Sequence, residues 1–258
     1  MPYLITFTLF APLFFSLLFK TVEFVFQEQS LIFTKRALIF ISFGVLAILT
    51  SLGISNYLMN PLVDFYTLFD ITSLSHNHMP PWLVVVFAFL VLDLANYLIH
   101  RFIHFVPFLW RFHRLHHSDR NVDALTTVLH HPLEVFINSI FIVGFYVAFD
   151  LPIILIIFYD ILLALHDAFA HTTMRIPRKI EQWGGYIFVM PVMHRTHHSI
   201  DMSYGNSNYG SIFSIWDRLL GTYKDTNKIN SHSIIFGVEA TKTPKSISTK
   251  ELLLNPFI

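Results

Sequence analysis

Histidine is the residue whose number and spacing in this chain could support chemistry. Fifteen histidines occur among 258 residues, of which only 13% are charged. Residues three and four positions apart lie on the same face of a helix, so imidazoles with that spacing can converge on a metal ion. We expect each H-x-x-H-H motif to supply three imidazoles to one small volume. The motifs are His100-Arg-Phe-Ile-His104, His113-Arg-Leu-His116-His117 and His194-Arg-Thr-His197-His198.

These eight motif histidines are more than one metal ion needs and are enough for two ions with open coordination positions. Imidazole binds Zn, Cu, Fe and Ni, so the spacing alone does not select the metal. A structural zinc site uses four ligands, often including cysteine, and this sequence contains no cysteine. Disulfides, thiolate zinc sites, iron–sulfur clusters and cysteine nucleophiles are therefore excluded. The pattern predicts a di-metal site with redox chemistry.

Further candidate residues flank the motifs. His171 is expected to complete the coordination shell. His166 lies five positions earlier, which is about 140° around a helix, so it reaches the same metal only if the helix ends or bends between them. Ligation by His166 stays open. In the segment His130-His131-Pro-Leu-Glu134, we expect His131 and Glu134 to support the ligands by packing or hydrogen bonding, with His130 the less favoured residue.

Two polar residues precede the first motif on one apolar segment. Asp93 and Asn96 lie seven and four positions before His100, and therefore on the same helix face. A metal-bound histidine usually donates its second N–H to a carboxylate or carbonyl. A carboxylate inside a membrane span is costly and usually functional. We expect Asp93 and Asn96 to support His100; the alternative for Asp93 is a hydrogen bond to a neighbouring helix.

The elements that position these residues are predicted to be membrane helices. Hydrophobic residues make up 54% of the chain, mean hydropathy is +0.56, and the charged fraction is half of the roughly 25% usual in soluble domains. A membrane helix needs about 20 mostly apolar residues. Asp150 and Pro152 interrupt the last apolar region, which predicts a hairpin of two shorter helices. The four regions are 3–19, 37–54, 82–99 and 133–164.

The distribution of basic residues predicts the orientation of these spans. The segment from Ser51 to Pro81 and the hairpin contain no Lys or Arg. If the first span runs from outside to inside, all 17 Lys and Arg fall on one side, which the positive-inside rule makes cytoplasmic. The histidine motifs lie on that side. A formal net charge of zero gives no argument for a nucleic-acid partner.

The sequence therefore predicts an all-α fold, a multi-span membrane helical bundle whose cytoplasmic helical cap carries the histidine-rich di-metal site. We expect N-terminal spans and a loop in 1–81, a catalytic domain in 82–223 and a polar tail in 224–258. The first apolar stretch lacks a basic n-region and a small-residue cleavage site, so it is expected to be a retained membrane helix. His76, His78 and His232 are expected to be ordinary loop residues.

On these motifs the sequence resembles the fatty acid hydroxylase / sterol desaturase superfamily, whose pattern is H-x3-H, H-x2-H-H and a final H-x2-H-H. Neighbouring residues match as well, including His131-Pro132-Leu133-Glu134, Asn208-Tyr209-Gly210 and the segment from Trp216 to Tyr223. The resemblance runs from Leu92 to Tyr223, about half of the chain. In this family the residues that correspond to His166 and His171 are commonly separated by three residues rather than four.

The resemblance implies a membrane-bound, non-haem di-iron oxidoreductase that uses O2 and two electrons to hydroxylate or desaturate a lipid C–H bond. It implies a separate electron carrier such as cytochrome b5 or a ferredoxin, supplied by NAD(P)H. It also implies the endoplasmic reticulum in a eukaryote or the inner membrane in a bacterium. Zinc replaces iron in some crystallised relatives. Sterol, sphingolipid, fatty acyl, alkylglycerol and carotenoid-like substrates all stay open.

Two other classes of protein use membrane histidines as non-catalytic ligands. A di-haem b protein needs isolated histidine pairs on facing spans, which clustered triplets fit poorly. A metal transporter places its ligands near the membrane midplane, whereas these motifs lie at span ends. A zinc metalloprotease is disfavoured because H-E-x-x-H is absent.

The orientation can be tested with two reporter tags. A tag after Ile258 should be cytoplasmic, and a tag inserted near Asn60 should lie on the opposite side, because the basic residues fix the orientation. Protease protection in sealed membrane vesicles distinguishes the two sides. Finding both tags in the same compartment would contradict the predicted spans or their direction.

Overall fold

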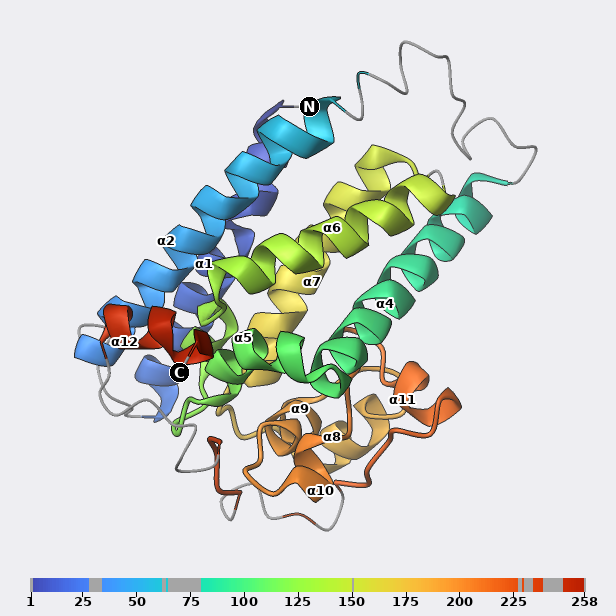
Figure 1. Ribbon diagram of the computed structural model, residues 1–258. Coiled ribbons are helices and arrows are strands. Elements are labelled where there is room, and N and C mark those ends of the chain that lie inside the picture. The colour runs from blue at the N-terminus through green and yellow to red at the C-terminus, as the bar shows by residue number, and fades with distance from the viewer. Residues whose placement is uncertain are drawn as a thin grey trace.

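The computed structural model describes residues 2–27, 34–61, 64, 80–149, 151–226, 229, 234–238 and 248–257, without the side chains of residues 2–7 and 27. The described residues form helices and no strand, which confirms the all-α prediction. Long helices run side by side, and short helices gather at one end of them (Figure 1). The long helices are α1 (Pro2–Gln27), α2 (Lys35–Ile54), α4 (Pro81–Phe105), α6 (Pro132–Phe149) and α7 (Ile153–His171).

Five helices of the described chain are long and apolar enough to cross a membrane. They correspond to the predicted apolar regions, and α6 and α7 form the predicted hairpin in 133–164. Asp150 lies outside the described residues, while Pro152 directly precedes α7 and takes an extended conformation. Proline fixes its own φ and cannot donate a backbone N–H, so it separates the two helices.

The short helices form the cap at one end of the bundle. In Figure 1, α5 and α8 to α11 lie together at the lower ends of α4 and α7, and α12 lies beside α2. The tail is tied to this end, because the Arg114 guanidinium of α5 donates to Asn255. The cap elements are α5 (Pro107–His117), η3 (Ala124–Val128), α8 (Arg178–Gly184), α9 (Pro191–His197), α10 (Met202–Gly205), α11 (Ile215–Leu219), α12 (Thr249–Leu254) and η6 (Asn255–Phe257); η1 (Ser55–Met59) extends α2.

Prolines determine where the histidine-bearing helices begin. α4, α5 and α9 each have proline in their first turn, where the missing N–H would have no helical partner. The residue before Pro107 is Val106, which has φ −90° and ψ 112°. A residue before proline avoids the helical region, so α4 ends there and the chain changes direction. As a result His113 of α5 returns to His104 of α4, with ring centroids 4.9 Å apart.

Apolar packing joins the long helices to the cap. Phe43 of α2 packs in one buried cluster with Leu115 of α5 and Leu125 of η3. A second cluster joins Leu92 of α4 to Tyr159 of α7. Between membrane helices this packing stabilises the fold through dispersion contacts, each worth about 0.1–0.2 kcal/mol per atom pair, because lipid is as apolar as the core. The helices that carry the histidines are therefore held by the same core as the bundle.

A buried ion network fixes α1 and α2 to the segment that follows α5. Lys20 Nζ donates to Asp123 Oδ2 at 2.8 Å, and Arg36 Nη1 donates to the same oxygen at 2.9 Å. Arg36 also pairs with Asp119. Asp123 caps η3, because its Oδ1 accepts the N–H of Leu125 at 3.0 Å. Every charge in this network has an opposite partner, which offsets the cost of burying it.

Asp123→Asn should destabilise the fold. Burial alone would raise the pKa of Asp123, but Arg36 and Lys20 lower it below its ordinary value, so the carboxylate is charged. Asparagine keeps the cap but removes the charge that the two buried cations share; each cation keeps a second carboxylate, so the cost is about 3 kcal/mol, the lower end of the range for breaking a buried pair. The measurement is the thermal unfolding midpoint in detergent. Asp201→Asn is the matched control, because Asp201 is an exposed helix cap and asparagine caps equally well. Equal midpoints for both variants would contradict this role.

Candidate metal centre

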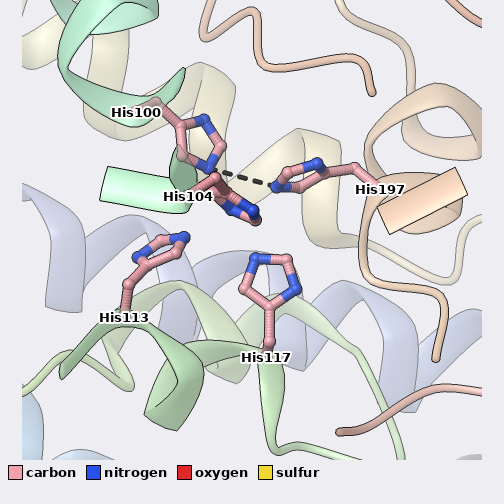
Figure 2. A group of neighbouring side chains, drawn as sticks. All are labelled: His100, His104, His113, His117 and His197. Carbon is pink, nitrogen blue, oxygen red and sulfur yellow. Dashed lines mark hydrogen bonds between the residues drawn. The ribbon is translucent and has the colours of Figure 1, made fainter. Parts of the chain in front are cut away.

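Nine histidines converge in two groups at the cap end of the bundle. Within each group the potential ligand nitrogens lie within 4.8 Å of one another. Figure 2 shows the first group, with five imidazoles directed toward a common centre from α4, α5 and α9. The second group takes its members from α5, α7 and the end of α9. The first group contains His100, His104, His113, His117 and His197, and the second contains His116, His171, His194 and His198.

Each H-x-x-H-H motif is divided between the two groups, so the expectation that a motif serves one small volume is wrong. Positions i and i+4 differ by about 40° around a helix, whereas i+3 and i+4 differ by about 100°. His113 and His117 therefore face the first group together, and His116 faces the second. In the motif His194-x-x-His197-His198 the first and last histidines again lie in one group, here the second. His197 lies in the first group.

The two groups are immediate neighbours. The rings of His117 and His198 stack with centroids 4.3 Å apart and planes 17° apart, although they belong to different groups. His116 and His117, also in different groups, have centroids 5.6 Å apart. The two groups therefore adjoin each other through these rings.

The nitrogen spacing fits metal coordination. The Nε2 atoms of His100 and His197 are 3.1 Å apart, and the Nε2 atom of His171 lies 3.1 Å from that of His116 and 3.0 Å from that of His194. Metal–imidazole bonds of about 2.0–2.1 Å place neighbouring ligand nitrogens roughly 3.0–3.4 Å apart. Several buried ring nitrogens also have no hydrogen-bond partner among the described residues, which a bound ion would provide. They include Nε2 of His113 and His117 and both ring nitrogens of His104.

Two histidines of the first group are oriented by one loop. His100 donates its Nδ1–H to the carbonyl of Tyr209 at 2.9 Å, and His197 donates to the carbonyl of Ser207 at 2.8 Å. Between these residues Asn208 has φ 57°, a left-handed conformation that asparagine tolerates better than most residues. The turn directs both carbonyls at histidines, and each hydrogen bond leaves Nε2 facing the metal position.

Glu134 forms hydrogen bonds with His113 of the first group and with His130, a residue that sequence reasoning ranked low. Its Oε1 accepts the Nδ1–H of His113 at 2.7 Å and that of His130 at 2.9 Å. The ring of His130 also stacks on His116, with centroids 4.3 Å apart. The sequence feature that could have identified His130 is its spacing of four residues from Glu134. This spacing places both residues on one side of the turn that begins α6.

Asp93 and Asn96 do not contact the histidines as expected. Asp93 instead accepts the backbone N–H groups of Ile212 and Phe213, at 3.1 and 3.0 Å, and the hydroxyl of Tyr159 at 2.9 Å. Asn96 donates to that hydroxyl at 3.2 Å. The alternative role, a partner for a neighbouring element, therefore describes Asp93, because the loop after Tyr209 lies between it and the ligands.

Asp217 supports the same loop from the other side and was not predicted. Its carboxylate accepts the N–H of Tyr209 at 2.7 Å and that of Gly210 at 2.8 Å. A Cβ on Gly210 would lie 2.8 Å from the Phe213 carbonyl and 2.9 Å from this carboxylate, so glycine is required there. The Tyr209 carbonyl, which accepts the hydrogen bond from His100, belongs to the same peptide group as the Gly210 N–H. The Asp217 carboxylate therefore fixes its direction.

His131 and His166 lie away from the two groups. His131 accepts the N–H of Leu133 at the start of α6, and its Nε2 contacts the carbonyl of Leu253. It therefore joins α6 to the tail rather than supporting a ligand. The helix α7 includes both His166 and His171, so their side chains leave it in different directions. The ring of His166 lies near the ring of Phe169.

Burial keeps five of the histidines in the two groups neutral. It lowers the pKa of His197 to about 3, although the hydrogen bond to the Ser207 carbonyl opposes the shift. A neighbouring imidazolium would be unfavourable as well, since like charges repel in a buried site. Neutral imidazole is the form that binds a metal. Burial also lowers the pKa of His116, His117, His194 and His198 well below the ordinary value.

The remaining histidines cannot be placed. His76, His78 and His232, expected to be loop residues, lie outside the described part of the chain.

The fold and the site together define a helical membrane protein with two adjacent histidine groups whose geometry suits metal ligation. Residues 85–222 match the fatty acid hydroxylase family. The match covers more than half of the chain and includes every histidine of both groups. The chain therefore belongs to the fatty acid hydroxylase family.

Curated relatives cover a similar part of the chain. It is 31% identical to the ornithine lipid hydroxylase OlsE of Rhizobium tropici over 62% of the chain and 49% of that protein. It is 26% identical to the alkylglycerol monooxygenase of Homo sapiens over 78% of the chain and 43% of that protein. It is 28% identical to a methylsterol monooxygenase of Aspergillus fumigatus over 54% of the chain and 46% of that protein. The chain thus spans less than half the length of each of these relatives, and no solved structure is significantly similar to it.

The two groups can be tested by removing a helical pair from each. His100→Ala with His104→Ala removes two ligands of the first group, and His194→Ala with His198→Ala removes two of the second. The variant of the second group keeps two imidazoles, so bound metal should fall from two ions per chain to about one; the variant of the first group keeps three, the number that holds a catalytic zinc, so its metal should be lost only in part. Elemental analysis of purified protein measures this. His166→Ala is the control and should keep both ions; loss of metal in that variant would place His166 among the ligands.

Proposed function

We propose that this chain is a membrane-bound, O2-dependent oxidoreductase that hydroxylates a C–H bond of a lipid at two iron ions held by the nine histidines. The observation that carries the proposal is that both histidine groups border a cavity that continues between the membrane helices. Imidazole ligands suit iron, and zinc would bind the same set in a purified form. Iron bound here would supply O2 binding and the redox chemistry that an unactivated C–H bond requires.

The cavity has two connected parts. The inner part has a volume of about 120 Å³ and is lined by members of both groups, including His100 and His116. The outer part, about 440 Å³, lies between α1, α2, α6 and α7 and is lined mostly by aliphatic side chains. The two parts share Asn96, His130 and Asn138 among their lining residues. A cavity of this kind favours an apolar chain and would direct it toward the ligands.

The protein's own residues orient the site and exclude water. The carbonyls of Ser207 and Tyr209 and the Glu134 carboxylate hold the outward-facing N–H groups of three ligands. Their Nε2 atoms consequently face inward without further adjustment when a metal binds. The buried aliphatic wall keeps bulk water away from the reacting C–H bond, which protects an oxidising site from side reactions.

The relatives support hydroxylation in particular. Their names describe hydroxylases or monooxygenases of ornithine lipid, alkylglycerol and methylsterol. For this chain we therefore favour an alcohol product over an alkene. Two electrons would come from a separate carrier such as cytochrome b5 or a ferredoxin with its reductase, and ultimately from NAD(P)H.

We assign the catalytic role to 82–223, with further spans from 1–81 and a tail in 224–258 that packs on the cap. The basic residues favour a cytoplasmic active site, in the endoplasmic reticulum of a eukaryote or the inner membrane of a bacterium. That side would also give a soluble electron carrier access to the cap.

Replacing His197 by alanine tests the function. The change removes a ligand of the first group, so we expect product formation to fall by about 100-fold or more while the apolar core keeps the fold. Asp93→Asn should cost less, about tenfold, because it weakens the anchor of the loop but leaves all ligands in place. The assay measures conversion of alkylglycerol, sterol and ornithine lipid in membranes supplied with iron, O2 and a reductase chain.

Reactions without O2 and the variant His166→Ala serve as controls. The first should give no product and the second should retain activity. If His197→Ala converts the lipid as fast as the wild type does, the second H-x-x-H-H motif has no part in the reaction. An Asp93→Asn loss as large as that of His197→Ala would mean that the loop anchor matters as much as a ligand.

A further inference from the structure

The outer cavity contains a carboxylate at mid-depth. Asp160 lies within α7, eleven residues before His171, which corresponds to about 16 Å along the helix axis. It is only partly buried, because it faces the cavity. Its surroundings in the cavity wall are apolar and include Ile157 and Ala164, one turn away on either side. A charged or polar group in this position is remote from the metal ligands.

The polar groups of this cavity lack a positive partner. Tyr146 of α6 donates its hydroxyl hydrogen to Asp160. None of the residues that line the cavity is Lys or Arg, and Asp160 forms no ion pair with any residue of the described chain. Asn138, closer to the histidines, has a buried Oδ1 without a hydrogen-bond partner in the described structure. The cavity wall therefore carries neutral serine, threonine and asparagine side chains and the carboxylates of Asp160 and Asp167, but no lysine or arginine.

An acceptor left in an apolar cavity is costly unless a ligand satisfies it. Burying a polar group without a hydrogen bond is unfavourable, and a carboxylate inside a membrane span is usually functional. The buried ion network of Lys20, Arg36 and Asp123 shows how this chain treats structural charges, because there each carboxylate has a cation. Asp160 is arranged differently: it has no cation, and the single hydroxyl of Tyr146 leaves further acceptor positions on its two oxygens.

We propose that Asp160, which also accepts a hydrogen bond from Tyr146, is a recognition site for a hydrogen-bond-donating hydroxyl or amino group carried by the lipid. The inference rests on the proposed function in taking a lipid as the occupant of the cavity. It makes the substrate class an amphiphile with a donor group inside the membrane, and it disfavours unsubstituted hydrocarbon chains. Asp160 would select the lipid without touching the oxidised carbon, since it lies far from the ligands.

Three probes of equal chain length separate the possibilities. Hexadecanol donates a hydrogen bond, hexadecyl methyl ether only accepts one, and hexadecylamine carries a positive charge. Binding to the purified full chain in detergent is measured by competition against radiolabelled hexadecanol. The ratio of the two dissociation constants, ether over alcohol, is compared between variants, so that unequal partitioning into micelles cancels. No turnover is needed, so the outcome is independent of whether the chain oxidises a lipid.

The wild-type ratio should exceed that of Asp160→Leu by about tenfold, as expected for one net hydrogen bond of about 1.4 kcal/mol. Asp160→Asn keeps an acceptor, so it should retain the preference for the alcohol but lose any added affinity for the amine. A preference of the wild type for the amine identifies an amino lipid, and its absence identifies a hydroxyl lipid.

Two further variants separate recognition from a structural role. Tyr146→Phe removes the hydrogen bond between α6 and α7 but leaves the carboxylate, so the ratio should persist. Ser139→Ala is the matched control in the same cavity, because the Ser139 hydroxyl already donates to the Val135 carbonyl at 2.8 Å. Both variants should resemble the wild type.

An unchanged ratio in Asp160→Leu would overturn the proposal. If that variant does not fold, the wild type alone decides: hexadecanol must raise its thermal unfolding midpoint more than the ether does. Equal stabilisation by the two probes would overturn the proposal as well. A selective cavity in a chain that forms no oxidised product would instead refute the proposed function and leave this inference standing.

Discussion

The hydrogen bonds from His100 and His197 to the loop around Asn208 are the interaction on which the site depends. Those histidines lie on α4 and α9, which are far apart in the sequence, and only this loop holds both of their Nδ1 atoms. The loop is in turn fixed by Asp217 from one side and by Asp93 from the other. Without these carboxylates the carbonyls would be free to turn away, and the two imidazoles would lose their common direction. A membrane helix, a loop and a cap helix thus act as one rigid unit.

The long helices could be predicted from the sequence because lipid imposes a simple requirement. A helix that crosses a membrane must be apolar over about 20 residues, and such runs are visible in the sequence. The break at Pro152 and the start of α5 at Pro107 are local consequences of proline and needed no knowledge of the fold. Histidine spacing likewise indicated the ligands, because a helix repeats every 3.6 residues.

The sequence could not show which way each side chain points in the folded molecule. The division of His116 from His117 follows from helix geometry only once the positions of two separate groups are known. His130 and His131 are adjacent, and which of them meets Glu134 depends on how the chain turns into α6. The acceptors for His100 and His197 are backbone carbonyls, which carry no residue-type signal. Asp93 has the expected burial, but a loop more than a hundred residues later occupies the space between it and the ligands.

Two carboxylates inside the molecule have different surroundings, and we infer different roles for them. Asp123 is surrounded by cations and loses little by being buried, so it can fasten α1 and α2 permanently. Asp160 faces an apolar cavity with only a tyrosine hydroxyl, and its environment is completed only by a molecule that enters. The inner end of this cavity is lined by histidines, some of whose ring nitrogens have no hydrogen-bond partner in the described structure and would be completed by a bound metal. A bound molecule with a hydrogen-bond donor at one end could contact Asp160 while its other end lies beside the metal position. An elongated amphiphile can fill both ends of the cavity in this way, and water cannot.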